Sequence, residues 1–346
     1  MDTFCYAFSN DHIDLQNPYR FANTYADRSQ VDECPASGGG TSRKLEGESS
    51  RTAAARKKVT IQTMYNLTHT KTPIAMLTAY DFPTGRACEA YGVDVTLVGD
   101  SLAQVCLGYD STTRLTMDEM VHHCRAVSRG SKTPLLIADM PFGSYHASSE
   151  DAMRNAVKLM QDGGAEAVKM EGGQEIVESV RRLTQMGIPV MAHVGLLPQR
   201  HISMSGYKVQ GRTADSARSV LHSALALQDA GAFSVVLEAI PHRLGAYITS
   251  KLSIPTIGIG AGPGTSGQVL VWSDVMSTWA GHKAKFVRRF ADVQAESEKG
   301  VAGYIRAVRE GTFPDPKREG YEMDVKEWEA LLDMEGDADW SAPQST

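Results

Sequence analysis

Two segments in the middle of the chain read Leu135-Leu-Ile-Ala-Asp139 and Ala167-Val-Lys-Met-Glu171. The apolar runs within them, residues 135–138 and 167–170, are continuous rather than alternating, as is typical of parallel strands buried on both faces. Six further runs of this kind occur in the chain: Ile74–Thr78, Val95–Val98, Val190–Val194, Ser234–Leu237, Thr256–Ile259 and Val269–Trp272. The sequence therefore predicts eight strands.

Amphipathic segments with recognisable helix ends separate these runs. Thr116 and Glu119 form the pattern of a capping box, and Gly130 lies where a C-cap glycine would end that helix. Thr213 marks the start of another helix. Repeated alternation of strand and helix predicts a parallel sheet, which right-handed crossovers build into an open doubly wound sheet or a closed barrel. Eight strands favour the α/β fold known as the (β/α)₈ TIM barrel.

The regular pattern covers only part of the 346 residues. We expect residues 1–58 to form a disordered N-terminal extension, because a Ser-Gly-Gly-Gly stretch and a polar, partly basic tract replace the apolar periodicity there. Residues 59–290 are expected to form the catalytic barrel. Residues 291–346 are expected to form a C-terminal helical appendage and tail.

The overall composition favours a small-molecule partner. A net charge of −6 and a pI near 5.9 argue against nucleic acid, whose binding needs a concentrated basic surface. No apolar run approaches the ~20 residues of a membrane span, so we expect no membrane partner. The five cysteines are scattered without a Cys-x-x-Cys pair, and we expect them to be free thiols.

Polar and ionisable residues end or follow five of the predicted strands, at the end where barrel enzymes carry their active sites. They are Asp100, Ser101, Asp139, Lys169, Glu171, His193 and Glu238. In a closed barrel all of them would face one mouth, although they are far apart in the sequence.

The carboxylates of this set suit a hard cation such as Mg²⁺, which takes two carboxylates together with water and a chelating substrate. Asp100 and Asp139 are the leading candidate ligands. Glu171 would be a third ligand or would accept a hydrogen bond from a metal-bound water. The alternative is that these acids pair with Lys or Arg and tie the strand ends together.

A 2-oxo acid chelated at such an ion would have an acidic C–H beside its keto group, and a base must take that proton. Glu238 is the candidate because it lies on a separate strand, outside the metal cluster; its alternative is a structural ion pair. Lys169 would stabilise the substrate carboxylate or the developing enolate oxygen, whereas the neighbouring carboxylates disfavour a Schiff base. His193 either orients the substrate or is a core histidine.

A glycine-rich stretch, Gly258–Gly267, is similar in composition to a phosphate-binding loop. It lacks the Gly-Lys-Ser/Thr ending of a P-loop and lies too late in the chain to open a dinucleotide-binding unit. Close turns at the barrel mouth are an equally good interpretation.

Seven short phrases occur in a fixed order along the chain: Leu77-Thr-Ala-Tyr-Asp81, Leu97-Val-Gly-Asp-Ser101, Ala138-Asp-Met-Pro-Phe142, Val168-Lys-Met-Glu-Gly-Gly173, Gly206-Tyr-Lys-Val-Gln-Gly-Arg212, Leu237-Glu238 and Gly258-Ile-Gly-Ala-Gly262. Together they resemble the ketopantoate hydroxymethyltransferase (3-methyl-2-oxobutanoate hydroxymethyltransferase) family. The resemblance runs from about Val59 to about Phe290.

This resemblance implies that Asp100, Asp139 and Glu171 form a Mg²⁺ site, with Glu171 bound directly or through water. Asp100, Ser101, Asp139 and Lys169 would bind the 2-oxo acid, and Glu238 would accept the proton. The family belongs to the barrel superfamily of phosphoenolpyruvate- and isocitrate-type lyases. It uses 5,10-methylenetetrahydrofolate to make 2-dehydropantoate on the pantothenate route, and it forms large homo-oligomers.

The resemblance also bears on location and on rival functions. Members of the family from organelle-bearing cells are often mitochondrial, so we expect a mitochondrial location, with the cytoplasm as the alternative because the extension begins with many acidic residues. Two other functions stay open. One is a related lyase that cleaves a C–C or C–P bond with the same Mg²⁺–oxo-acid geometry, and the other is a metabolite-binding barrel without turnover.

Overall fold

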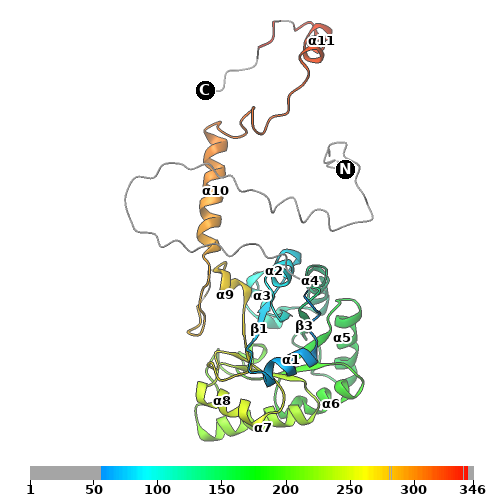
Figure 1. Ribbon diagram of the computed structural model, residues 1–346, viewed down its shortest axis with the longest axis vertical. Helices are drawn as coiled ribbons and strands as arrows, with labels where there is room; N and C mark the ends of the chain where they lie inside the picture. The colour runs from blue at the N-terminus through cyan, green and yellow to red at the C-terminus, as the bar shows by residue number, and fades with distance from the viewer. Residues whose placement is uncertain (1–55, 280, 282, 338, 342–346) are drawn as a thin grey trace, which may run out of the picture. The chain divides into compact units, whose positions relative to one another are not determined.

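The computed structural model describes residues 56–279, 281, 283–337 and 339–341 (Figure 1). The expected extension therefore lies outside the described residues as far as residue 55. Eight strands are present: β1 (Ile74–Thr78), β2 (Val95–Val98), β3 (Leu135–Asp139), β4 (Ala167–Glu171), β5 (Val190–Gly195), β6 (Ser234–Glu238), β7 (Thr256–Ile259) and β8 (Gly267–Leu270). They pair in parallel and in sequence order, and β8 pairs with β1, so the sheet closes into a barrel.

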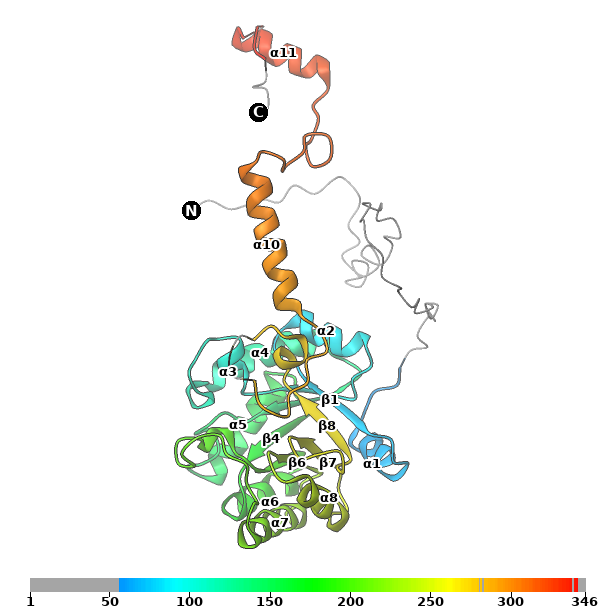
Figure 2. The ribbon, with the colours of Figure 1, turned by 90° about the vertical axis from the view of Figure 1, so that its left-hand side faces the viewer.

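Helices lie between the strands and surround them (Figure 2). The α-helices are α1 (Ile61–His69), α2 (Phe82–Ala90), α3 (Leu102–Val105), α4 (Met117–Gly130), α5 (Ser149–Gln161), α6 (Val177–Gln185), α7 (Ala214–Asp229), α8 (His242–Lys251), α9 (Trp272–Met276), α10 (Val293–Arg309) and α11 (Val325–Glu335). Short 3₁₀ turns cover η2 (Thr112–Arg114), η3 (Gln174–Ile176) and η4 (Pro198–Arg200). The expected (β/α)₈ barrel is confirmed. None of these helices is long and apolar enough to cross a membrane.

The helix signals in the sequence were largely reliable. Thr116 caps α4 and forms a capping box with Glu119, and Thr213 caps α7. Gly130 was expected to be a C-cap, and that prediction is wrong, because it is the last residue of α4 and Ser131 is the cap. A Cβ on Gly130 would lie 2.6 Å from the carbonyl oxygen of Phe82. The glycine is therefore required where α2 and α4 cross closely.

The eighth strand was expected at residues 269–272 but lies at Gly267–Leu270, and Trp272 begins α9. Gly267 pairs with Ile74 of β1, where an added Cβ would approach the Ile74 carbonyl oxygen to 2.5 Å. The closing strand thus needs a glycine for close approach. A glycine interrupts a continuous apolar pattern, so the pattern does not reveal where this strand begins.

Two apolar clusters fill the fold. One lies inside the barrel, where Met76, Leu97, Ile137, Met191 and Val236 pack together with Met64 of α1 and Val59. The second fills the space between the strands and the surrounding helices. Apolar side chains occupy the part of the barrel interior next to α1. The polar residues of the strands lie at the opposite end of the barrel, at the carboxyl ends of the strands.

Candidate active site at the barrel mouth

The carboxyl ends of the strands surround a cavity of about 370 Å³. All seven residues singled out from the sequence line it: Asp100, Ser101, Asp139, Lys169, Glu171, His193 and Glu238. The strand register explains this convergence. Asp139 is opposite Lys169 on β4, and Glu171 is opposite His193 on β5. Lys169 and Glu171 are two residues apart on one strand and so point to the same side of the sheet.

Three buried carboxylates surround one ammonium group. Lys169 Nζ lies 2.6 Å from Asp139 Oδ1 and 3.8 Å from Glu171 Oε1. The backbone N–H of Asp100 donates to Asp139 Oδ2 at 2.9 Å. Burial, followed by the charges of Glu171 and Asp139, raises the pKa of Asp100 well above its ordinary value. The cluster thus holds more negative charge than Lys169 balances.

The charged form of Lys169 is favoured by this environment. Burial lowers the pKa of Lys169, but the carboxylates of Asp139, Glu171 and Asp100 outweigh burial and raise it above the ordinary value. A Schiff-base lysine needs a depressed pKa. The ammonium group of Lys169 is instead suited to electrostatic work.

His193 lies between two carboxylates from neighbouring strands. Its Nδ1 is 3.5 Å from Glu171 Oε1, and its Nε2 is 3.2 Å from Glu238 Oε2. Burial and Lys169 oppose a charge on the ring, but Glu171 and Glu238 outweigh them and raise the pKa of His193 to about 9. An imidazolium at this position would connect Glu238 to the acid cluster electrostatically.

A glutamine that the sequence did not single out holds two of the acids. Gln199 of η4 is 3 % exposed, and its Nε2 donates to Asp100 Oδ2 at 2.9 Å and to the Met140 carbonyl at 3.0 Å. Its backbone N–H donates to Glu171 Oε2 at 3.1 Å. The hydroxyl of Tyr145 donates to Gln199 Oε1 at 2.7 Å. Its place shortly after the predicted strand at Val190–Val194 was the only signal in the sequence.

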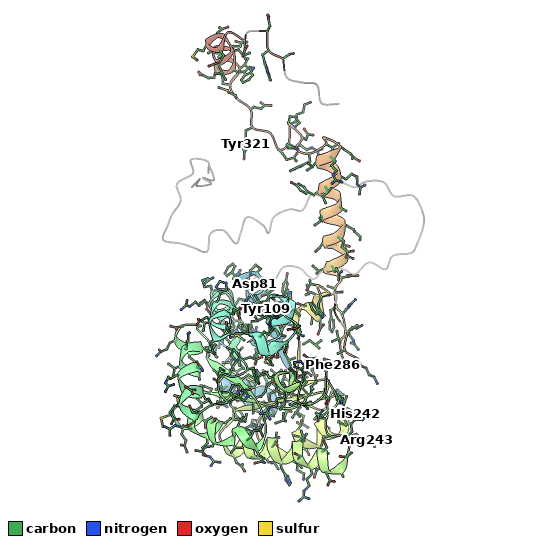
Figure 3. All side chains as sticks on the ribbon, turned by 180° about the vertical axis from the view of Figure 1, so that it is seen from behind. Asp81, Tyr109, His242, Arg243, Phe286 and Tyr321 are labelled. Carbon is green, nitrogen blue, oxygen red and sulfur yellow. The ribbon has the colours of Figure 1, made fainter. Side chains whose placement is uncertain are left out.

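The cavity extends beyond the charged cluster. Tyr207, Trp279 and Phe286 add aromatic surface to its lining, and Phe286 is labelled in Figure 3. None of these aromatic residues was predicted as part of the site. The cavity therefore combines a charged region with an apolar one, as sites for organic anions do.

The carboxylates of the cavity offer oxygen ligands of the kind that Mg²⁺ prefers. Among the described residues, no three His, Cys, Asp or Glu side chains form a ready-made metal cage. Glu171 already accepts from Gln199 and faces both Lys169 and His193. Asp139 and Asp100 are also paired, with Lys169 and Gln199, so hydrogen bonding does not separate the three acids. Asp100 and Asp139 stay the candidate direct ligands, since Mg²⁺ usually binds through one or two carboxylates and several waters. The residues fit such an ion, whose charge would offset the surplus negative charge.

The glycine-rich stretch between β7 and β8 packs closely on neighbouring elements. A Cβ on Gly262 would lie 2.3 Å from His242 Cβ, and one on Gly264 would lie 2.6 Å from Ala246 Cβ. Gly260 and Gly262 have φ values of +65° and +81°. These features favour the interpretation as close turns against α8, since each glycine is needed where it stands.

The sequence matches the ketopantoate hydroxymethyltransferase family over residues 58–316. The chain belongs to this family. A relative from Deinococcus radiodurans, named 3-methyl-2-oxobutanoate hydroxymethyltransferase, is 51% identical over 72% of this chain and 88% of its own length. A relative of the same name from Dehalococcoides mccartyi is 47% identical over 79% of this chain and 97% of its own length. The expected family, and with it a transferase, is thus confirmed.

Solved structures share the barrel at low identity. A phosphonopyruvate hydrolase complexed with oxalate and Mg²⁺ has a TM-score of 0.50 and 14% identity, covering 80% of this chain and 95% of its own. An oxaloacetate acetylhydrolase with 3,3-difluorooxalacetate has the same score and identity, covering 80% of this chain and 94% of its own. At this identity the likeness concerns the fold alone.

One expectation from the sequence is overturned by the relatives. A mitochondrial location was expected, but the similar proteins come from bacteria, including Deinococcus radiodurans, Heliobacterium modesticaldum and Carboxydothermus hydrogenoformans. Bacteria have no mitochondria, so the mitochondrial prediction is wrong.

Proposed function

We propose that the protein transfers a hydroxymethyl group from 5,10-methylenetetrahydrofolate to 3-methyl-2-oxobutanoate, giving 2-dehydropantoate for pantothenate synthesis. Mg²⁺ would be the metal, held by Asp100 and Asp139. The observation that carries the proposal is that this cluster shares one cavity with a separate carboxylate, Glu238, in a chain of this family. Metal binding and proton abstraction then fall to different residues.

The size of the cavity supports two reactants. 3-Methyl-2-oxobutanoate has eight non-hydrogen atoms, and even at the ~30 Å³ that a water takes in the liquid it would fill about 240 Å³. The cavity is about 370 Å³ and is open to solvent on one side. Room therefore remains beside the oxo acid for the reacting end of a second molecule.

Bound Mg²⁺ would draw electrons from the keto group of the oxo acid and so make the C3–H bond acidic. The carboxylate of Glu238 takes that proton. His193 Nε2 lies 3.2 Å from Glu238 Oε2, so an imidazolium there would attract the carboxylate. Lys169 supplies a positive charge for the substrate carboxylate or the enolate oxygen.

The test uses the purified full-length protein. We expect 2-dehydropantoate to form only when 3-methyl-2-oxobutanoate, 5,10-methylenetetrahydrofolate and Mg²⁺ are all present. Omitting the folate should stop product formation. Cleavage of an oxo acid without folate would instead assign the protein to the lyases, and binding of the oxo acid without any turnover would indicate a metabolite-binding barrel.

A further inference from the structure

Four polar groups form a continuous row at the junction of the first, second and last strands. The backbone N–H of Trp272 donates to Thr78 Oγ1 at 2.8 Å, and Thr78 Oγ1 donates to the Tyr80 hydroxyl at 2.7 Å. The Tyr80 hydroxyl lies 2.9 Å from Ser101 Oγ. β8 and β1 lie side by side where this row begins (Figure 2). The row ends at Ser101, which lines the cavity.

Counting hydrogens gives the row a direction. The Trp272 N–H can only donate, so Thr78 accepts there and uses its single hydrogen toward Tyr80. The Tyr80 oxygen has then accepted one bond, and its own hydrogen has one oxygen within reach, Ser101 Oγ. The hydrogen of Ser101 is left over, and no acceptor among the described residues takes it.

Burial excludes the opposite direction between Tyr80 and Ser101. If Ser101 donated to Tyr80, the phenol hydrogen would have no partner, and Tyr80 is only 3 % exposed. An unpaired buried donor carries the full cost of its desolvation. Ser101 faces the cavity, where water or a ligand can accept its hydrogen. Burial also raises the pKa of Tyr80, so the phenol keeps its proton.

The backbone on either side keeps Tyr80 in place. His123 Nδ1 of α4 donates to the Tyr80 carbonyl oxygen at 2.6 Å. The Tyr80 N–H donates to Thr84 Oγ1 of α2 at 2.9 Å. The backbone of Tyr80 is thus fixed by contacts from two helices, and its phenol by Thr78. A hydroxyl held in this way imposes its orientation on a smaller, freely rotating partner.

We propose that Tyr80 is a positioning residue that fixes Ser101 as a hydrogen-bond donor into the cavity. The group that takes the Ser101 hydrogen must then be an acceptor, and the carboxylate or keto oxygen of a 2-oxo acid is such a group. The identification of this acceptor as a 2-oxo acid rests on the proposed function. The fixed hydroxyl makes Ser101 favour a ligand oxygen that accepts a hydrogen bond.

The kinetic test compares two Tyr→Phe variants. Tyr80→Phe removes the oxygen that accepts from Thr78 and donates to Ser101. We expect KM for 3-methyl-2-oxobutanoate to rise roughly 10-fold with little change in kcat, because a binding interaction becomes weaker. Tyr109→Phe is the matched control, since its phenol donates to Glu119 at 2.6 Å and does not line the cavity. It should leave KM unchanged.

A double variant separates positioning from a general loss of structure. In a Ser101→Ala background, Tyr80→Phe should add no further rise in KM, because the hydroxyl that Tyr80 orients is gone. A purely structural Tyr80 would lower thermal stability and leave KM as it was in folded protein. An unchanged KM in folded Tyr80→Phe, or additive effects in the double variant, would overturn the proposal.

The direction of the row can also be measured without any reaction. Neutron diffraction from deuterated crystals of the full chain should place the deuterium between these two residues on the Tyr80 oxygen. Finding it on Ser101 would refute the proposal directly. A wild-type protein that fails to turn over the oxo acid while keeping this arrangement would count against the proposed function alone, so the two failures are distinguishable.

Discussion

Asp139 contacts a cation with one carboxylate oxygen and a backbone donor with the other, because its oxygens face Lys169 Nζ and the backbone N–H of Asp100. We expect Asp139→Asn to lower Mg²⁺-dependent turnover by about 100-fold or more, since the amide keeps the shape but loses the negative charge that binds the ion. Calorimetric titration with Mg²⁺ and a steady-state assay measure this. Normal turnover with unchanged Mg²⁺ dependence in the folded variant would remove Asp139 as a ligand.

Gln199 is a neutral residue that donates hydrogen bonds to Asp100 and Glu171. Replacing it measures how strongly metal binding depends on such a neighbour. Gln199→Met keeps the length of the side chain but removes the donor to Asp100 and the acceptor for Tyr145. We expect Mg²⁺ affinity to fall about 10- to 100-fold, as is usual when a hydrogen-bond partner of a metal ligand is lost.

Gln228→Met is the control for this variant. Gln228 accepts from the backbone of Ser253 and does not line the cavity, so its loss should leave Mg²⁺ affinity unchanged. Equal affinities in the two variants would mean that Gln199 plays no part in metal binding.

The charged residues of the site could be chosen from the sequence, whereas the neutral ones could not. Lys169 and Glu171 stand at the end of an apolar run, and a barrel brings all such ends together. Gln199 and Tyr80 act through loops whose path no periodicity reveals. Gln199 is 99 residues from its partner Asp100, and Tyr80 is 21 residues from its partner Ser101, so only the folded barrel makes them neighbours. The roles of all these residues stay predictions.

At the scale of elements, strand existence was easier to predict than strand ends. Seven of the eight runs coincide with strands to within one residue, because residues buried on both faces leave a continuous apolar signature. The eighth run was displaced because β8 begins with Gly267 and a glutamine. Glycines gave the weakest signal, since the same residue serves as a cap, a turn or a place of close approach.

The crossing of α2 and α4 gives a direct test at this scale. Gly130→Ala would place a Cβ 2.6 Å from the Phe82 carbonyl and 2.9 Å from the Arg86 nitrogen. We expect it to lower the free energy of unfolding by about 1–3 kcal/mol, as overpacking commonly does.

Gly300→Ala in α10 is the matched control, because an added Cβ there meets nothing within 4 Å. It should stabilise the protein by up to about 1 kcal/mol through helix propensity. Denaturant unfolding of both variants measures the difference. Stabilisation by both would show that α2 and α4 do not approach closely at Gly130.

At the scale of the whole molecule, the family match begins at residue 58, and contacts to the barrel begin slightly earlier. Lys58 Nζ donates to the Pro134 carbonyl at 2.7 Å, and Arg56 pairs with Asp94 at 2.8 Å. We expect removal of residues 1–55 to leave turnover and thermal stability unchanged, because that segment lacks the apolar periodicity of a core.

Removal of residues 1–58 is the companion variant. It should lower the free energy of unfolding by about 1–2 kcal/mol, since it deletes the hydrogen bonds of Lys58 and Arg56, which are partly exposed. Turnover by the folded protein should again be normal. Inactivity of the shorter deletion, 1–55, would contradict the assignment of catalysis to the barrel alone.

The whole account depends on one carboxylate acting as the base across the mouth from the acid cluster. Glu238→Gln keeps the size of the side chain and its contact with His193 but removes the basic oxygen. Loss of a positioned base commonly costs ~10²–10⁴-fold in rate, while binding of the oxo acid and Mg²⁺ should survive.

The most direct measurement is hydrogen–deuterium exchange at C3 of 3-methyl-2-oxobutanoate in D₂O with Mg²⁺ present, followed by NMR. It detects proton abstraction without requiring the folate. We predict rapid exchange with the wild-type protein and a collapse of both exchange and hydroxymethyl transfer with Glu238→Gln. Normal exchange by the well-folded variant would contradict the account, because the enolate would then form without Glu238.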